Sequence, residues 1–175
     1  YNIVQENEMP QYDYGYHPIA RQKFKEIFNK DPIDFKNPEL STEWRQFRLN
    51  AITTLVNEII VIAHSKNIKV TAAVFPFPEM SRQMVRQAWD DWNLDAAYPM
   101  LYQNFYRENI NWIGFATKQG VNDVNFPIFS GLYVGALREP NDFEEAIIIS
   151  KENGASGISI FTADGLSKEQ QAVLV

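Results

Sequence analysis

Lys69-Val-Thr-Ala-Ala-Val-Phe75 is a short β-branched run with almost no polar residue. Pro76 and Pro78 follow it at once and mark its end. A run of this composition is typical of a strand that is covered on both faces, and sheets buried in this way are usually parallel. The stretch therefore predicts a buried strand of a parallel sheet.

Three further runs of the same kind follow along the chain, each starting 25 to 33 residues after the previous one. They lie at residues 94–101, 127–136 and 157–162. Each of the four runs precedes a helical pattern. These patterns lie at residues 79–92, 104–119, 141–152 and 167–174. Such spacing requires parallel strands with right-handed crossovers, so we predict an α/β fold of four βα repeats.

The residues before the first strand predict a loop and two helices. Residues 1–17 read as an N-terminal loop, and a helix begins at Pro18 and stops before Asp31-Pro32. A longer helix begins near the candidate caps Asn37 and Ser41. Its apolar stripe must face a core. The stripe consists of Phe47, Ile52, Leu55, Val56, Ile59 and Ala63.

Two architectures fit four parallel βα repeats: an open doubly wound sheet, or part of a (β/α)8 barrel, which needs about 250 residues in full. The strand ends distinguish them. Phe75-Pro-Phe-Pro and Tyr98-Pro-Met-Leu-Tyr contain no glycine-rich phosphate loop. Aromatic and proline residues suit the mouth of a barrel better. We therefore expect one domain over residues 1–175 that forms half of a barrel.

The composition excludes several classes of function. The chain has a formal net charge of -6, which argues against a non-specific binder of nucleic acid or anionic membranes. It contains no cysteine, which excludes thiolate metal sites, and with only two histidines neither a multi-histidine metal site nor a cofactor is expected. No apolar run approaches the roughly 20 residues of a membrane span.

Five motifs together resemble the C-terminal half of the glycosyl hydrolase-like 10 family. They are Tyr14-Gly-Tyr-His-Pro-Ile-Ala-Arg21, Glu43-Trp-Arg-Gln-Phe-Arg48, Thr71-Ala-Ala-Val-Phe-Pro76, Trp92-Asn-Leu-Asp-Ala-Ala-Tyr-Pro-Met-Leu-Tyr102 and Gly154-Ala-Ser-Gly-Ile-Ser-Ile-Phe161. The resemblance implies a bacterial TIM-barrel glycosidase that is secreted, periplasmic or an outer-surface lipoprotein. It also implies four further βα units upstream, so that the present strands are the fifth to the eighth of the barrel.

Hydrolysis of a glycosidic bond generally uses two carboxyl groups, and in a barrel both lie at strand carboxyl ends. Glu79, after the first strand, is the candidate acid or base; its alternative role is a first-turn helix acid. Asp164, after the last strand, is a candidate partner for a sugar hydroxyl, or else a turn residue. The resemblance implies that the second catalytic carboxylate lies upstream.

Two further polar candidates precede the first strand. His17 lies on the loop that should follow the fourth barrel strand, where it could assist proton transfer or cap the helix that begins at Pro18. Arg45, with Arg48 three residues on, could grip a carboxylate of a uronic acid or of the upstream half. An ordinary salt bridge is the alternative for Arg45.

Three tyrosines are the candidates for direct contact with the sugar. Tyr98 and Tyr102 alternate along one strand and its exit, so they can point the same way into the mouth, and Tyr133 ends the next strand. An aromatic ring covers the C–H groups of a sugar while the phenol oxygen bonds its hydroxyls. Core packing is the competing role for all three.

The sequence supports three functions for the chain. The first is a glycoside hydrolase acting on a poly- or oligosaccharide, with this chain as half of its catalytic barrel. The second is a carbohydrate-binding barrel without catalysis. The third is an inactive fragment that forms a homodimer through its open sheet edges, which are rows of unpaired amide groups.

Overall fold

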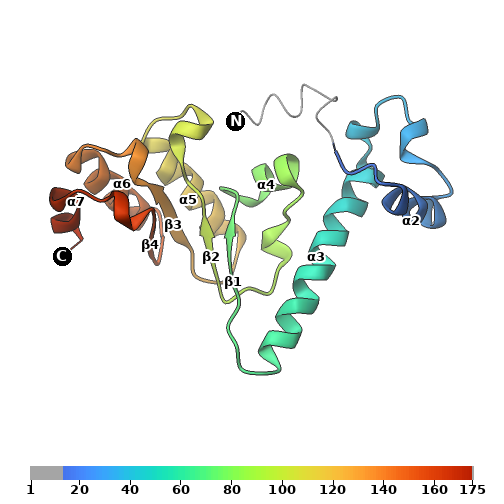
Figure 1. The fold of residues 1–175 in the computed structure, drawn as a ribbon, viewed down its shortest axis with the longest axis horizontal. Coiled ribbons are helices and arrows are strands. Elements are labelled where there is room, and N and C mark those ends of the chain that lie inside the picture. Colours follow the sequence, from blue (N-terminus) through green and yellow to red (C-terminus); the bar gives the residue numbers. More distant parts are fainter. Residues whose placement is uncertain (1–13, 175) are drawn as a thin grey trace.

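The computed structural model describes residues 14–174, in which four short parallel strands alternate with helices (Figure 1). The strands are β1 (Thr71–Val74), β2 (Ala96–Pro99), β3 (Phe129–Tyr133) and β4 (Gly157–Phe161). The α-helices are α2 (Pro18–Phe28), α3 (Thr42–His64), α4 (Pro78–Val85), α5 (Asn111–Asp123), α6 (Pro140–Glu152) and α7 (Lys168–Val173). The four strands expected from the sequence are present. Of the predicted N-terminal loop, residues 1–13 lie outside the described residues.

The strands form two small parallel sheets that lie side by side in chain order (Figure 1). In the first sheet β1 pairs with β2, and in the second β3 pairs with β4. Two isolated parallel bridges, Ala97 to Ile128 and Met100 to Gly131, join β2 to β3. All four strands therefore run in one direction, and their carboxyl ends meet at one edge.

Helices cover one face of these strands. Val74, Ala97 and Ile128 point into one buried cluster with Ile60 of α3 and Trp89, and Leu132 points into a second cluster beneath α5 and α6. The alternate residues point to the opposite face. These are partly or largely exposed, and they include Ala73, Tyr98, Phe129, Tyr133 and Phe161.

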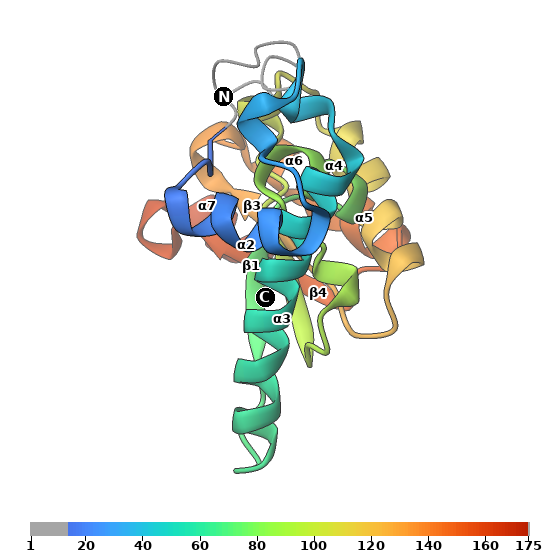
Figure 2. The ribbon, with the colours of Figure 1, turned by 90° about the vertical axis from the view of Figure 1, so that its right-hand side faces the viewer.

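The predicted cap of the long helix is confirmed, but its apolar stripe is only half covered. The hydroxyl of Ser41 accepts a hydrogen bond from the backbone N–H of Trp44 and begins α3. Ile52 and Val56 pack against the core, whereas Leu55 and Ile59 are 59% and 53% exposed. The expectation that the whole stripe faces a core was therefore wrong, because α3 extends past the sheet on one side (Figure 2).

Two predicted helices are shorter than their patterns indicated. The helix expected over residues 79–92 is α4, which ends where Arg86 adopts a left-handed conformation (φ 61°). The chain then forms a separate 3-10 turn that contains Trp89. The helix expected over residues 104–119 begins only at Asn111, because Arg107 takes a left-handed φ of 59° and ends a preceding 3-10 turn.

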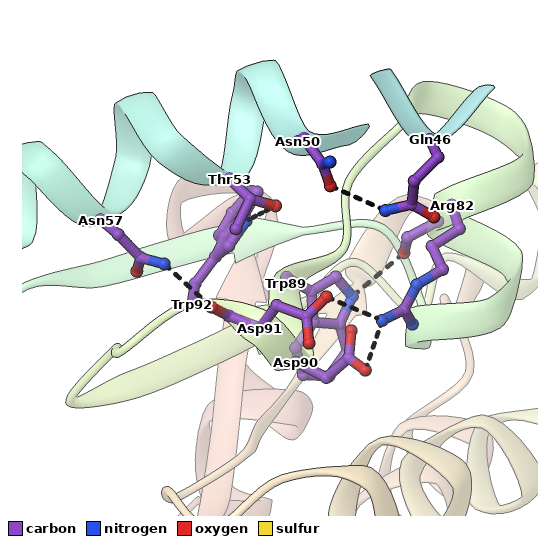
Figure 3. A network of polar contacts seen from close by, with 10 residues as sticks. Gln46, Asn50, Thr53, Asn57, Arg82, Trp89, Asp90, Asp91 and Trp92 are labelled. Carbon is purple, nitrogen blue, oxygen red and sulfur yellow. Dashed lines mark hydrogen bonds and ion pairs between the residues drawn. The ribbon is translucent and has the colours of Figure 1, made fainter. Parts of the chain in front are cut away.

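A polar network attaches the connection between α4 and β2 to α3 (Figure 3). Asn57 donates to the carbonyl of Asp91 at 3.0 Å and accepts from the backbone N–H of Asn93 at 3.0 Å. Inside the core, the indole N–H of Trp89 donates to the hydroxyl of Ser81 at 3.0 Å. Because both partners of this last bond are fully buried, water cannot replace either of them.

Arg82 supplies the ionic part of the same network. Its guanidinium contacts Asp90 at 2.7 Å and Asp91 at 3.2 Å, so it links α4 to the 3-10 turn that follows it (Figure 3). These acidic partners raise the pKa of Arg82 above its ordinary value against the opposing effect of burial. The pair with Asp90 is the better shielded of the two, since the Asp91 side chain is largely exposed.

The amino ends of β1 and β2 are joined through Asp95. Its carboxylate accepts hydrogen bonds from the backbone N–H of Val70 at 2.7 Å and from His64 Nε2 at 2.8 Å. These two bonds, the Val70 bond first, hold the pKa of Asp95 below its usual range. Asp95 therefore fixes the end of α3 against the sheet, far from the strand carboxyl ends.

Among residues 14–174, no helix has both the length and the apolar character needed to cross a membrane.

Candidate functional site: an aromatic cluster at the strand carboxyl ends

Four aromatic side chains meet where β2, β3 and β4 end. Tyr102 follows β2, Phe105 lies in the 3-10 turn after it, Tyr133 ends β3 and Phe161 ends β4. The ring centroid of Tyr102 lies 6.0 Å from that of Phe105, 5.8 Å from that of Tyr133 and 5.6 Å from that of Phe161. The Tyr133 centroid is 5.6 Å from that of Phe105 and 6.0 Å from that of Phe161. We call these four residues the aromatic cluster.

The strand register explains why these residues meet. Tyr133 and Phe161 are direct partners in the pairing of β3 with β4. The bridge from Met100 to Gly131 extends the same pairing, so Tyr102, two residues past Met100, comes level with Tyr133. Parallel strands in this register place residues of one row on one face. The aromatic cluster is thus the last row of side chains at the carboxyl edge.

The aromatic cluster is partly exposed to solvent. Phe105 is 45% exposed and Phe161 is 51% exposed, while the two tyrosines are half-buried. Burial raises the pKa of the Tyr102 phenol, so this group remains a neutral hydrogen-bond donor and acceptor at physiological pH. Exposed phenyl rings beside phenol groups can cover the C–H face of a sugar and bond its hydroxyls.

Gly135 leaves the room that the Tyr133 ring occupies. A Cβ atom placed on Gly135 would overlap the ring and hydroxyl of Tyr133. A larger residue at 135 would therefore push the Tyr133 ring out of its present position. The aromatic cluster depends on this glycine as well as on its own rings.

Tyr106, in the 3-10 turn that carries Phe105, packs against Trp112 at the start of α5. Their ring centroids lie 5.0 Å apart. Burial, together with the nearby Tyr102, raises the pKa of Tyr106 well above its ordinary value. Tyr106 is therefore a partly buried neutral phenol, and its contact with Trp112 helps to anchor the segment carrying Phe105.

Asp164 lies three residues after Phe161, in a 3-10 turn at the same edge. One of its carboxylate oxygens accepts a hydrogen bond from the hydroxyl of Thr162. The residue is exposed. Asp164 thus occupies a turn, as its alternative role predicted, three residues beyond the Phe161 end of the aromatic cluster.

Glu79 lies in the first turn of α4, after the end of β1, and it is exposed. The pKa of Asp123, at the end of α5, is raised mainly by burial and by the charge of Asp90. The charge of Glu79 makes a smaller contribution in the same direction. Glu79 is therefore near enough to the helical layer for its charge to affect Asp123. Glu79 is thus at the expected edge of the sheet, beside β1, whereas the aromatic cluster spans β2 to β4.

The other three sequence candidates lie apart from the aromatic cluster. The Nδ1 atom of His17 accepts a hydrogen bond from the backbone N–H of Ile19 at 3.3 Å, so His17 caps α2. Arg45 lies half-buried in the first turns of α3. Tyr98 stacks on Phe129 with ring centroids 5.1 Å apart, four residues before Tyr102, which corresponds to about 13 Å along a strand.

Arg48, the suggested companion of Arg45, belongs to a separate aromatic pocket. Its guanidinium lies 5.0 Å from the ring centroid of Trp44 and 5.8 Å from that of Tyr16. It also donates to the backbone carbonyl of Tyr14 at 2.9 Å. Arg48 therefore stabilises the packing between α3 and the segment before α2.

Phe105 and Phe161 were missed among the sequence candidates. A signal for Phe161 was present, because Gly157, Ser159 and Phe161 alternate along the last strand as Tyr98 and Tyr102 do along the second. Phe105 had no such signal, since it lies in a 3-10 turn inside a stretch predicted as α-helix.

Across residues 14–174, histidine, aspartate and glutamate form no group of three that could hold a metal ion. Comparison of the sequence with models of protein families found no match, and comparison with curated proteins found none either.

Proposed function

We propose that this chain is the C-terminal half of a (β/α)8 barrel that hydrolyses O-glycosidic bonds of a poly- or oligosaccharide outside the cytoplasm. The resemblance of the five sequence motifs motivates the reaction class and the location. The observation that supports the proposal is the aromatic cluster, because rings and phenols of the kind that suit a sugar lie at the carboxyl edge of parallel strands, and barrel enzymes have their active sites at that edge.

The order of the strands supports a barrel over a doubly wound sheet. The strands are neighbours in chain order, and each connection passes through a helix on the same face. In a doubly wound sheet the order reverses at a switch point, which places helices on both faces. A continuous order with right-handed crossovers curls a sheet in one sense, as a barrel requires.

In the proposed reaction Tyr102, Tyr133 and Phe161 hold the sugar, and Asp164 bonds one of its hydroxyls. Glu79 protonates the leaving glycosidic oxygen as the bond from that oxygen to the anomeric carbon breaks. A carboxylate from the upstream half activates the water or attacks the anomeric carbon. In this proposal Arg45 binds a carboxylate of the upstream half or of the sugar, and His17 assists proton transfer.

The test uses the longer parent protein that the motifs imply, incubated with a panel of oligosaccharides while new reducing ends are measured. We expect Glu79→Gln to lower turnover about 100-fold or more, as removal of a general acid does. Glu144→Gln, on the exposed side of α6, removes an equal charge and should leave turnover unchanged. Unchanged turnover in Glu79→Gln would reject Glu79 as the acid.

The second candidate is a carbohydrate-binding barrel that does not catalyse. The observation that favours it is the position of the two candidate carboxylates: Glu79 lies beside β1, apart from the aromatic cluster, and Asp164 accepts a hydrogen bond from Thr162. Saccharides that bind the parent protein without any cleavage would select this candidate over the hydrolase.

A further inference from the structure

Arg138 is a cation that is held in place at the carboxyl edge of the strands. It follows the 3-10 turn Val134–Ala136, which comes directly after β3. Its Nε atom donates a hydrogen bond to the carbonyl of Gly135 at 3.1 Å, and the residue is exposed. This bond uses Nε alone, so the two terminal nitrogens of the guanidinium remain open to a ligand. Among residues 14–174, no carboxylate forms an ion pair with Arg138.

Gly135 connects this cation to the aromatic cluster. A Cβ atom placed on Gly135 would overlap the ring and the hydroxyl of Tyr133, so the phenol lies directly against this glycine. The guanidinium of Arg138 is bound to the carbonyl of the same glycine. A single residue of backbone therefore separates a ring of the aromatic cluster from an arginine whose side chain is restrained.

A guanidinium beside aromatic rings matches the chemistry of a uronic acid. The C–H face of the sugar ring covers an aromatic ring. The carboxylate projects from the edge of the sugar ring, where two nitrogens of one arginine can bind its two oxygens in parallel. A neutral sugar would use the aromatic rings alone. The arrangement therefore favours a sugar that carries a carboxylate.

The acidic character of the whole chain opposes this contact only weakly. The formal net charge is -6, but exposed charges that lie farther apart than about 8 Å are largely screened at physiological salt. The affinity for a carboxylate therefore depends on the cation that touches it. Because an exposed ion pair contributes modestly, we expect a preference between sugars rather than the main part of the binding energy.

We propose that the aromatic cluster binds a uronic acid, with the sugar ring on Tyr133 and Phe161 and the carboxylate on Arg138. The inference rests on the proposed function, because it names the class of sugar that the same site takes. Arg138 is a specificity residue in this account. Arg45 is not needed for it, since Arg45 lies on α3, apart from the cluster.

Calorimetric titration with matched pairs of oligosaccharides tests the proposal. Each pair consists of a uronic-acid oligosaccharide and the same molecule with its carboxylates reduced to alcohols. The wild type should bind the acidic member about fivefold more tightly, which is the upper range for an exposed ion pair. In Arg138→Gln this preference should disappear while the affinity for the neutral member stays the same. Added salt should reduce the preference of the wild type.

Two further variants separate this role from a structural one. Lys151→Gln, exposed in the last turn of α6, removes an equal charge near the start of β4 rather than its end, and it should keep the preference. Arg138→Lys keeps the charge without the planar fork and should keep only part of the preference. If Arg138 only secured its turn, Arg138→Gln would lower the melting temperature and leave the ratio of the two affinities unchanged, and this result would overturn the proposal.

The same titrations distinguish failure of this inference from failure of the proposed function. Equal affinities of the wild type for both members of every pair would overturn the role of Arg138 and leave the sugar site in place. Binding of neither member in any pair would refute the sugar site itself, and this inference with it.

Discussion

Ser81→Ala should destabilise the fold more than its size suggests. Ser81 and Trp89 are both fully buried, and the indole N–H donates to the Ser81 hydroxyl at 3.0 Å. Removing the hydroxyl leaves that N–H buried without a partner, which costs about 1–3 kcal/mol. In a chain of this length, a loss of about 2 kcal/mol lowers the melting temperature by roughly 4–8 °C.

Thr53→Val provides the matched control. The Thr53 hydroxyl accepts a hydrogen bond from the indole N–H of Trp92 at 3.3 Å in a partly exposed position. Water can replace the hydroxyl there, so the expected cost is about 0.5–1 kcal/mol. Urea unfolding of both variants at one protein concentration measures the difference, with unchanged m-values as the check on two-state behaviour. Equal losses for Ser81→Ala and Thr53→Val would refute the reasoning.

Two further predictions concern Asp95, at the amino ends of β1 and β2, and Gln170 in α7. The lowered pKa of Asp95 stabilises the fold above the unfolded pKa of about 3.9, and this stabilisation is lost as the pH falls through the folded value. Asp95→Asn should therefore flatten the acid branch of the unfolding free energy, and an unchanged slope would contradict the assignment. Gln170→Ala removes a buried donor to the carbonyl of Leu137 at 2.6 Å and should speed amide exchange throughout α7. Gln171→Ala loses only an exposed hydrogen bond and should leave amide exchange in α7 unchanged. Equal exchange rates in the two variants would reject the role of Gln170.

The strands could be predicted because their signals are local and dense. The run from Lys69 to Phe75 contains β1, and Ser167 caps the start of α7, where the helical pattern of residues 167–174 also begins. The ends of the intervening helices could not be predicted in the same way. Arg86 and Arg107 adopt left-handed conformations that L-residues rarely take, and tertiary packing rather than local preference selects them.

Part of the candidate site could be predicted from the sequence, because strand geometry determines which residues meet. Tyr102 and Tyr133 meet because parallel pairing brings the ends of successive strands to one edge, which the spacing of the strands already implied. Tyr98 does not join them, because it lies four residues earlier and stacks on Phe129 instead. Alternation gives the face on which a side chain lies, but only the register gives its height along the strand.

Calorimetric titration with neutral oligosaccharides measures whether the aromatic cluster binds a sugar. Phe161→Ala should weaken binding about tenfold, which corresponds to about 1.4 kcal/mol. Phe115→Ala is the matched control, because Phe115 on α5 is also 51% exposed but lies outside the cluster; its affinity should equal that of the wild type. Equal affinities for the wild type and both variants would contradict sugar binding by the cluster.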